Sequence, residues 1–159
     1  MFKNGGKWLL LFATLLFSIT VVAQDRDTKE TEKRAQELFE KGQYSEAKKL
    51  YSNLVSLYPK EPNYNFKYGA CILYTSPDKT KALKYLDYAV SRPDMDPLGF
   101  YYAAQGYHYN YRFEKAINYY EQFRDEGSNR TVEDLNTSRK IQMCLNGQQL
   151  FQNVTQPIV

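Results

Sequence analysis

Residues Ala35 to Pro59 read AQELFEKGQYSEAKKLYSNLVSLYP, and their spacing predicts two helices joined by a tight turn. Ala35 and Ala47 are small residues twelve positions apart, the pattern expected where two helices cross at close range. Gly42 accommodates the turn between them, because glycine adopts left-handed backbone angles without steric cost. Pro59 ends the second helix, because proline lacks the amide hydrogen that a continuing helix needs. The stretch therefore predicts a helical hairpin.

This pattern recurs twice downstream, so that Ala47 has counterparts in Ala82 and Ala116 at intervals of about 34 residues. Helix–turn–helix units with this period are the sequence mark of the tetratricopeptide repeat, and residues 28–126 resemble that family. The resemblance implies an all-α fold, a right-handed superhelix of three helical hairpins at about 28–61, 62–95 and 97–130. The sequence departs from the family in three ways. No tryptophan stands at the usual first aromatic position, the second unit has one extra residue, and Tyr111 replaces the turn glycine of the third.

A further helix is predicted after the third unit. Thr131 and Asp134 resemble a capping box, and an apolar pattern that includes Leu135 and Ile141 follows them. We expect a C-terminal capping helix over 131–150, because the last hairpin of such a stack leaves an apolar flank uncovered. Residues 151–159 are expected to form an extended tail or linker, since Pro157 disfavours a helix. The repeat domain as a whole is predicted to span 24–150.

The first 23 residues have the features of a secretory signal peptide. Lys3 and Lys7 precede an apolar run from Trp8 to Val22, and Ala23 provides a small residue before Gln24. An uncleaved membrane anchor is the alternative, but the run is shorter than the roughly 20 residues that span a bilayer. We therefore expect export, to the periplasm or the periplasmic face of the outer membrane.

Composition argues against several functional classes. The formal net charge is +3, with acidic and basic residues well mixed, so a basic face for nucleic acid is not expected. His108 is the one histidine, which leaves a Ser-His-Asp triad or a two-histidine metal site without a partner. No glycine-rich phosphate loop and no CxxC motif occur. We expect no catalytic residues, no metal and no cofactor. Cys71 and Cys144 are either small buried residues or a disulfide pair, and spacing does not decide between these.

The tetratricopeptide resemblance also implies where a partner would bind. In that family the first helices of successive hairpins line a concave groove, and helical geometry turns a fixed set of positions toward it. The residues predicted to contact a partner are Phe66, Ala70, Tyr74, Tyr101, Gln105, His108 and Tyr109. Small Ala70, between Phe66 and Tyr74, is expected to leave a pocket. Members of the family that clamp a carboxylate use Lys, Asn and Arg in the groove, and the corresponding places here are Glu32, Gln36, Lys67, Leu98 and Tyr102.

These observations predict a non-catalytic scaffold that binds an extended or helical protein segment in a groove rich in tyrosine. Two alternatives stay open: a module that binds peptidoglycan or another glycan on the same tyrosines, and a structural spacer between envelope domains. The signal peptide ending in Ala-Gln, the tyrosine-rich repeats and the final Ile141-x-x-Cys144 are also similar to the N-terminal region of Bacteroidota envelope proteins. That resemblance implies a setting in an OmpA-like or type IX secretion-associated assembly, with the chain either a fragment or a standalone relative.

Overall fold

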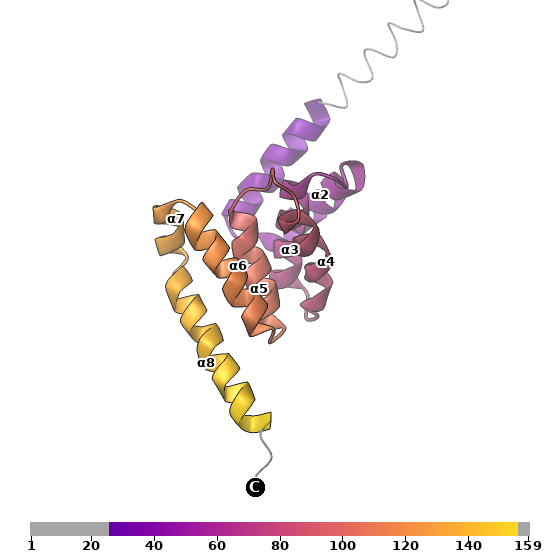
Figure 1. Cartoon of the computed structure of the whole chain (residues 1–159). Coiled ribbons are helices and arrows are strands. Elements are labelled where there is room, and N and C mark those ends of the chain that lie inside the picture. Colours follow the sequence, from indigo (N-terminus) through magenta and orange to yellow (C-terminus); the bar gives the residue numbers. More distant parts are fainter. Residues whose placement is uncertain (1–25, 156–159) are drawn as a thin grey trace, which may run out of the picture.

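The computed structural model describes residues 26–155, so the predicted signal peptide lies outside the described part. Within these residues the chain forms helices and no strands. In chain order the helices are 26–40, α2 (Tyr44–Leu57), α3 (Pro62–Thr75), α4 (Thr80–Val90), α5 (Leu98–Tyr109), α6 (Phe113–Glu126), α7 (Asn129–Asp134) and α8 (Thr137–Thr155) (Figure 1). The first six helices form three hairpins, and α8 lies along α6. The predicted all-α architecture of three hairpins and a terminal helix is confirmed.

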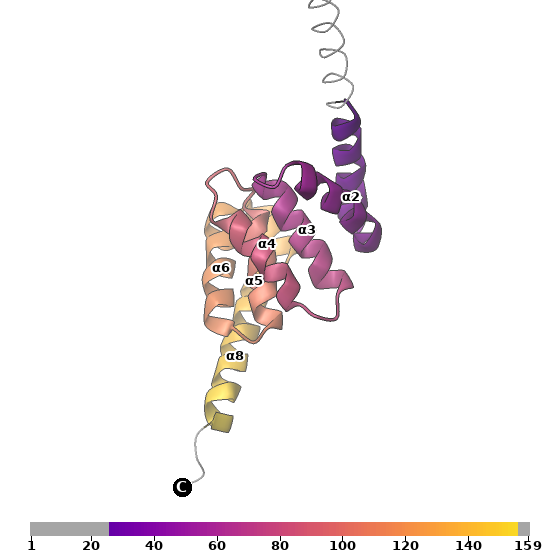
Figure 2. The ribbon, with the colours of Figure 1, turned by 90° about the vertical axis from the view of Figure 1, so that its right-hand side faces the viewer.

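The hairpins stack into a curved array (Figure 2). Each helix from α2 to α6 packs against its neighbours in the chain, and α3 also packs directly against α5. The second helices α4 and α6 make no comparable contact with each other among the described residues. First helices are therefore closer together than second helices, which places α3 and α5 on the concave side of the stack.

The periodic small residues lie where the helices meet. Ala47, Ala82 and Ala116, the counterparts that define the repeat, are all 0% exposed. Gly69 shows how close the approach is, because a Cβ atom added there would lie 2.8 Å from Cγ of Leu86. A larger side chain at such a point would force the helices apart, since protein interiors are packed to crystal-like density.

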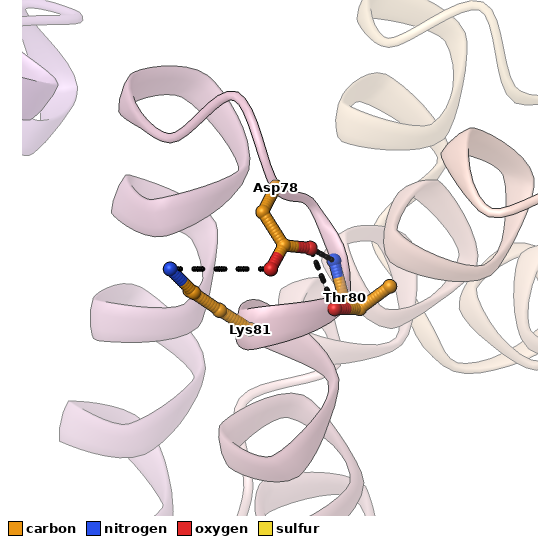
Figure 3. Close-up of polar contacts among 3 residues, drawn as sticks. All are labelled: Asp78, Thr80 and Lys81. Carbon is orange, nitrogen blue, oxygen red and sulfur yellow. Dashed lines mark hydrogen bonds and ion pairs between the residues drawn. The ribbon is translucent and has the colours of Figure 1, made fainter.

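The first and third hairpin turns share a left-handed residue, and the second is built differently. Gly42 in the first turn has φ of 70°, and Tyr111 in the third has φ of 57°, a left-handed conformation that non-glycine residues rarely adopt. The second turn is longer and uses a side chain instead. There the Oδ1 of Asp78 accepts hydrogen bonds from the backbone N–H of Thr80 at 3.0 Å and from its hydroxyl at 2.6 Å, and Lys81 lies 3.9 Å from Oδ2 (Figure 3).

Exchanging residues at the two left-handed turns should move stability in opposite directions. Gly42→Ala is expected to lower the free energy of unfolding by about 1 kcal/mol, because its Cβ would only reach ordinary van der Waals contact, 3.9 Å from Cε2 of Tyr44, and the backbone conformation alone is penalised. Tyr111→Gly should raise it by up to about 1 kcal/mol, less whatever its ring contacts contribute. Urea unfolding followed by circular dichroism measures both. A Gly42→Ala variant as stable as the wild type would contradict the assignment of strain.

The C-terminal region differs from the prediction of one helix over 131–150. A short helix, α7, begins at Asn129, and the Ser128 side chain caps it by accepting from the Thr131 N–H at 3.3 Å. The chain then breaks at Leu135 and Asn136, where Asn136 has φ of 51°, before α8 begins. The predicted Thr131 capping box was therefore wrong, because the serine three residues earlier takes that role. The predicted tail was also wrong in part, since α8 continues to Thr155.

Candidate functional site

Four of the seven predicted contact residues are buried, and two of these have no exposed surface at all. Phe66 and Ala70 on α3 are both 0% exposed. Tyr102 from α5 contacts the two rings on either side of Ala70: it stacks on Phe66 with centroids 6.1 Å apart and lies edge-on to Tyr74 at 6.4 Å. The pocket predicted beside Ala70 is thus filled by a tyrosine from the next repeat. In this conformation Phe66 and Ala70 form the floor of the groove and have no surface to offer a partner.

A hydrogen-bonded strip of side chains crosses the concave face above this floor. The Tyr74 hydroxyl donates to Oε1 of Gln105 at 2.7 Å, and Nε2 of Gln105 donates to the Tyr101 hydroxyl at 2.7 Å. Tyr44, from the start of α2, stacks on Tyr74 with centroids 4.3 Å apart and planes 17° apart. Tyr101 and Gln105 are only 5% and 4% exposed, whereas Tyr74 is 40% exposed. The strip therefore holds the exposed Tyr74 ring in one orientation.

The strip ends at the C-terminal turn of α5. Tyr109 is 43% exposed, and the ring of His108 stacks against it with centroids 6.3 Å apart. Burial, followed by the charge of Lys140, lowers the pKa of His108 below its ordinary value of 6.5. His108 is therefore neutral at pH 7 and adds polarity without charge. The predicted residues brought together at the surface are thus Tyr74, Tyr109 and His108.

The opposite end of the concave face carries charge. Glu32 and Glu40 on the first helix are exposed, and both act on Lys67 of α3. Burial is the main cause that lowers the Lys67 pKa, while Asp96, Glu32 and other carboxylates oppose the shift. The groove thus changes from mixed charge at the first hairpin to neutral aromatic side chains at the second and third.

Tyr44 and Tyr102 are groove residues that the predicted contact set left out. Tyr44 begins a second helix, so a rule based on first-helix spacing does not assign it. Tyr102 corresponds to a groove place of the carboxylate-clamping relatives, but it was not among the residues predicted to contact a partner. The Gly-x-Tyr sequence at the first turn was the available signal for Tyr44. For Tyr102 the signal is its contact with Phe39, 5.5 Å away on the first helix, which only the tertiary structure provides.

The buried tyrosines make stability sensitive to alkaline pH. Burial is the main cause that raises the pKa of Tyr51, Tyr102 and Tyr120 above the ordinary value of 10.0. Because the folded pKa lies above the unfolded one, the stabilisation is complete below pH 10 and is lost as the pH rises, by about 1.4 kcal/mol per pH unit for each tyrosine. We expect the circular dichroism signal of the helices to be lost cooperatively as the pH is raised above 10. Phenolate absorbance from all tyrosines while the helices persist would contradict it.

Cysteine thiols and clusters of metal-ligating side chains are the groups to consider for covalent or metal chemistry. Cys71 and Cys144 are free and buried, and burial raises their pKa to about 12 and about 11, so both are protonated thiols. Between residues 26 and 155, no cluster of three or more His, Cys, Asp or Glu side chains is arranged to hold a metal ion. Over the same residues, no helix has both the length and the apolar character needed to cross a membrane.

Two clefts of about 450 Å³ lie away from the tyrosine strip. One is between the third hairpin turn and the end of α8. The other lies between α3 and α4 of the second hairpin, and its lining residues are Tyr68, Ile72, Thr80, Lys81, Lys84 and Tyr85. Neither of these two clefts includes a residue of the predicted contact set.

Comparison with solved structures identifies the fold. The Yersinia enterocolitica type III secretion chaperone SycD, in complex with a peptide of the translocator YopD, matches with a TM-score of 0.61 and 15% identity, over 76% of this chain and 93% of that chain. The first TPR of Spaghetti (RPAP3), bound to the HSP90 peptide SRMEEVD, matches with a TM-score of 0.63 and 13% identity, over 77% and 93%. The Sgt2 TPR domain from Aspergillus fumigatus matches with a TM-score of 0.63 and 15% identity, over 84% and 86%.

Sequence comparison adds no closer relative. No protein-family model matches the chain, and no curated protein matches its sequence. The structural matches have low sequence identity but cover most of this chain and most of each matched chain. They agree with the period of about 34 residues in the sequence. The chain therefore has the tetratricopeptide-repeat fold.

Proposed function

We propose that the protein is a non-catalytic binding module that holds an extended or helical segment of another protein on its concave face. The observation that carries this proposal is the exposed ring of Tyr74, fixed by its hydrogen bond to Gln105 and its stacking on Tyr44. A preorganised tyrosine contributes a large contact area at low entropic cost, as binding hot spots do. Tyr109 and neutral His108 extend the same surface.

The solved structures of this fold support the choice of partner class. SycD is described in complex with a YopD peptide, and the Spaghetti domain with an HSP90 peptide. The groove here has neutral aromatic side chains at the second and third hairpins, so we propose a segment anchored by apolar or aromatic side chains. We further propose that the protein works in the bacterial cell envelope, in an OmpA-like or secretion-associated assembly, on the basis of residues 1–23 and the tyrosine-rich repeats.

Selection from a random library of twelve-residue peptides displayed on phage tests the binding proposal. Tyr74→Ala and Tyr109→Ala are each expected to weaken the selected peptides by about tenfold or more. Tyr58→Ala is the matched control, because Tyr58 is also 40% exposed but caps the end of α2 outside the strip. Equal effects of Tyr58→Ala and Tyr74→Ala would contradict the proposal.

The same variants distinguish the other two functions. A glycan-binding module would retain purified peptidoglycan in a pull-down and lose it on Tyr74→Ala, while selecting no peptides. A spacer would yield no ligand whose binding depends on Tyr74 or Tyr101.

For the location, fractionation of cells that express the whole chain with a C-terminal tag should place the protein in the periplasmic or outer-membrane fraction.

A further inference from the structure

An aromatic path leads from the tyrosine strip to the cleft beside α8. His108, which stacks on Tyr109, lies 5.9 Å from the ring of Phe113 at the start of α6. Phe113 in turn lies 5.8 Å from Phe151 on α8. These ring contacts therefore connect the end of the tyrosine strip to α8, which packs against α6.

The cleft at the end of this path has a volume of about 450 Å³, large enough for a bulky side chain and its neighbours. Its lining comes from the third hairpin turn and from α8: Tyr111, Arg112, Phe113, Glu114, Lys115, Gln148, Phe151 and Gln152. Two of its aromatic rings are strongly exposed, Tyr111 at 68% and Phe151 at 53%. The α8 helix runs past the end of the hairpins here (Figure 1). Contiguous exposed apolar side chains rimmed by polar residues are a feature of interaction sites.

The backbone at Tyr111 supports a binding role. Its φ of 57° is the conformation that Gly42 adopts in the first turn, so the tyrosine is kept where glycine would be unstrained. The strained turn directs the Tyr111 ring to within 5.8 Å of Phe151, which builds one wall of the cleft. Backbone strain of this size gathers at functional sites.

The charges around the cleft determine which partner fits. Arg112 and Lys115 are exposed, and both lie over the ring of Tyr107, at 6.0 Å and 5.0 Å from its centroid. No ion pair of either cation occurs among the described residues, and Glu114 is the single carboxylate in the lining. The cleft therefore combines an aromatic wall with a net positive rim.

We propose that this cleft binds a bulky apolar side chain of the partner segment, followed by a carboxylate residue that faces Arg112 and Lys115. The inference rests on the proposed function, because it makes the cleft the end of the same binding surface. The partner segment lies across Tyr74 and Tyr109, follows His108 and Phe113, and ends with its apolar and acidic pair at α8.

Two blocked dipeptides test the chemistry of the cleft without knowledge of the partner. N-acetyl-phenylalanyl-glutamate amide is expected to shift the NMR amide signals of residues 111–115 and 148–152 in a saturable titration. N-acetyl-phenylalanyl-lysine amide should bind about fivefold more weakly, since it differs only in the sign of its charge. Equal binding of the two dipeptides, or shifts confined to other residues, would overturn the proposal.

Variants assign the effect to the cleft. Phe151→Ala should weaken the glutamate dipeptide by about tenfold, and Arg112→Gln should remove most of the preference for glutamate. Lys84→Gln is the matched control, because Lys84 lines the second cleft of similar volume and should change nothing. If wild-type protein binds no dipeptide but self-associates through Phe151, the face belongs to a second copy of the chain and the proposal fails.

The test of the cleft and the test of the proposed function can fail independently of each other. Tyr74→Ala should leave dipeptide binding unchanged while it weakens the selected peptides. If selected peptides respond to Tyr74→Ala but not to Phe151→Ala or Arg112→Gln, the function stands and this extension fails. If dipeptides bind the cleft but no selected peptide depends on Tyr74, the proposed function fails, and the claim that the cleft continues its groove fails with it.

Discussion

Phe66→Ala is expected to lower the free energy of unfolding by about 3–5 kcal/mol, the usual cost of removing a fully buried aromatic ring. Phe66 is 0% exposed, and the Tyr102 ring stacks on it. Its loss leaves a cavity on the floor of the groove that the surrounding helices can fill only in part. Urea unfolding followed by circular dichroism measures the change, and the urea midpoint should fall while the slope stays the same.

Tyr74→Ala is the comparison that gives this result its meaning. Tyr74 lies two turns further along α3 and is 40% exposed, so its removal should cost well under half as much stability. The expected outcome is a division of roles within one helix face: Phe66 supports the fold and Tyr74 is available to a partner. A Phe66→Ala variant that keeps wild-type stability would show that the floor is not close-packed, and would return Phe66 to the set of contact residues.

The architecture could be predicted from the sequence because its determinants are local and repeated. Ala47, Ala82 and Ala116 recur with the period of the hairpin, and each is buried where two helices cross. Gly42 has the positive φ that its position in the turn predicted. The third turn keeps this geometry with Tyr111, so the departure from the family pattern changed the residue but not the backbone.

The accessible surface of the groove could not be predicted in the same way. Helical periodicity correctly places Phe66, Ala70 and Tyr74 on one face of α3. The solvent exposure of these side chains also depends on which side chains of the next repeat cover that face. Tyr102 of α5 reaches Phe66, Tyr74 and the Phe39 ring at once. No spacing rule within one repeat contains that contact.

The C-terminal boundaries were missed for a related reason. Ser128 and Thr131 are both good caps, and their order in the chain does not show which of them begins the helix. The end of α8 depends on contacts with a distant segment, since Phe151 packs 5.8 Å from both Tyr111 and Phe113 at the third turn. The prediction ended the helix at residue 150, whereas the structure continues it to Thr155, two residues before Pro157.

Cys144→Glu is expected to detach α8 and lower the free energy of unfolding by about 3–5 kcal/mol, because it buries an unpaired charge. Cys144 is 0% exposed on the face of α8 that packs against α6, where Phe123 and Tyr120 are also buried. Loss of α8 would expose these rings, so the variant should bind a hydrophobic dye and aggregate on gel filtration.

Leu145→Glu is the control. It places the same charge on the next residue, which is 38% exposed, and should leave the free energy of unfolding nearly unchanged. If both variants stay folded and monomeric, α8 is an appendage and not the cover of the last hairpin. If only Cys144→Glu fails, the stack requires α8, and any partner that uses the cleft beside Phe151 binds a part of the molecule on which the whole fold depends.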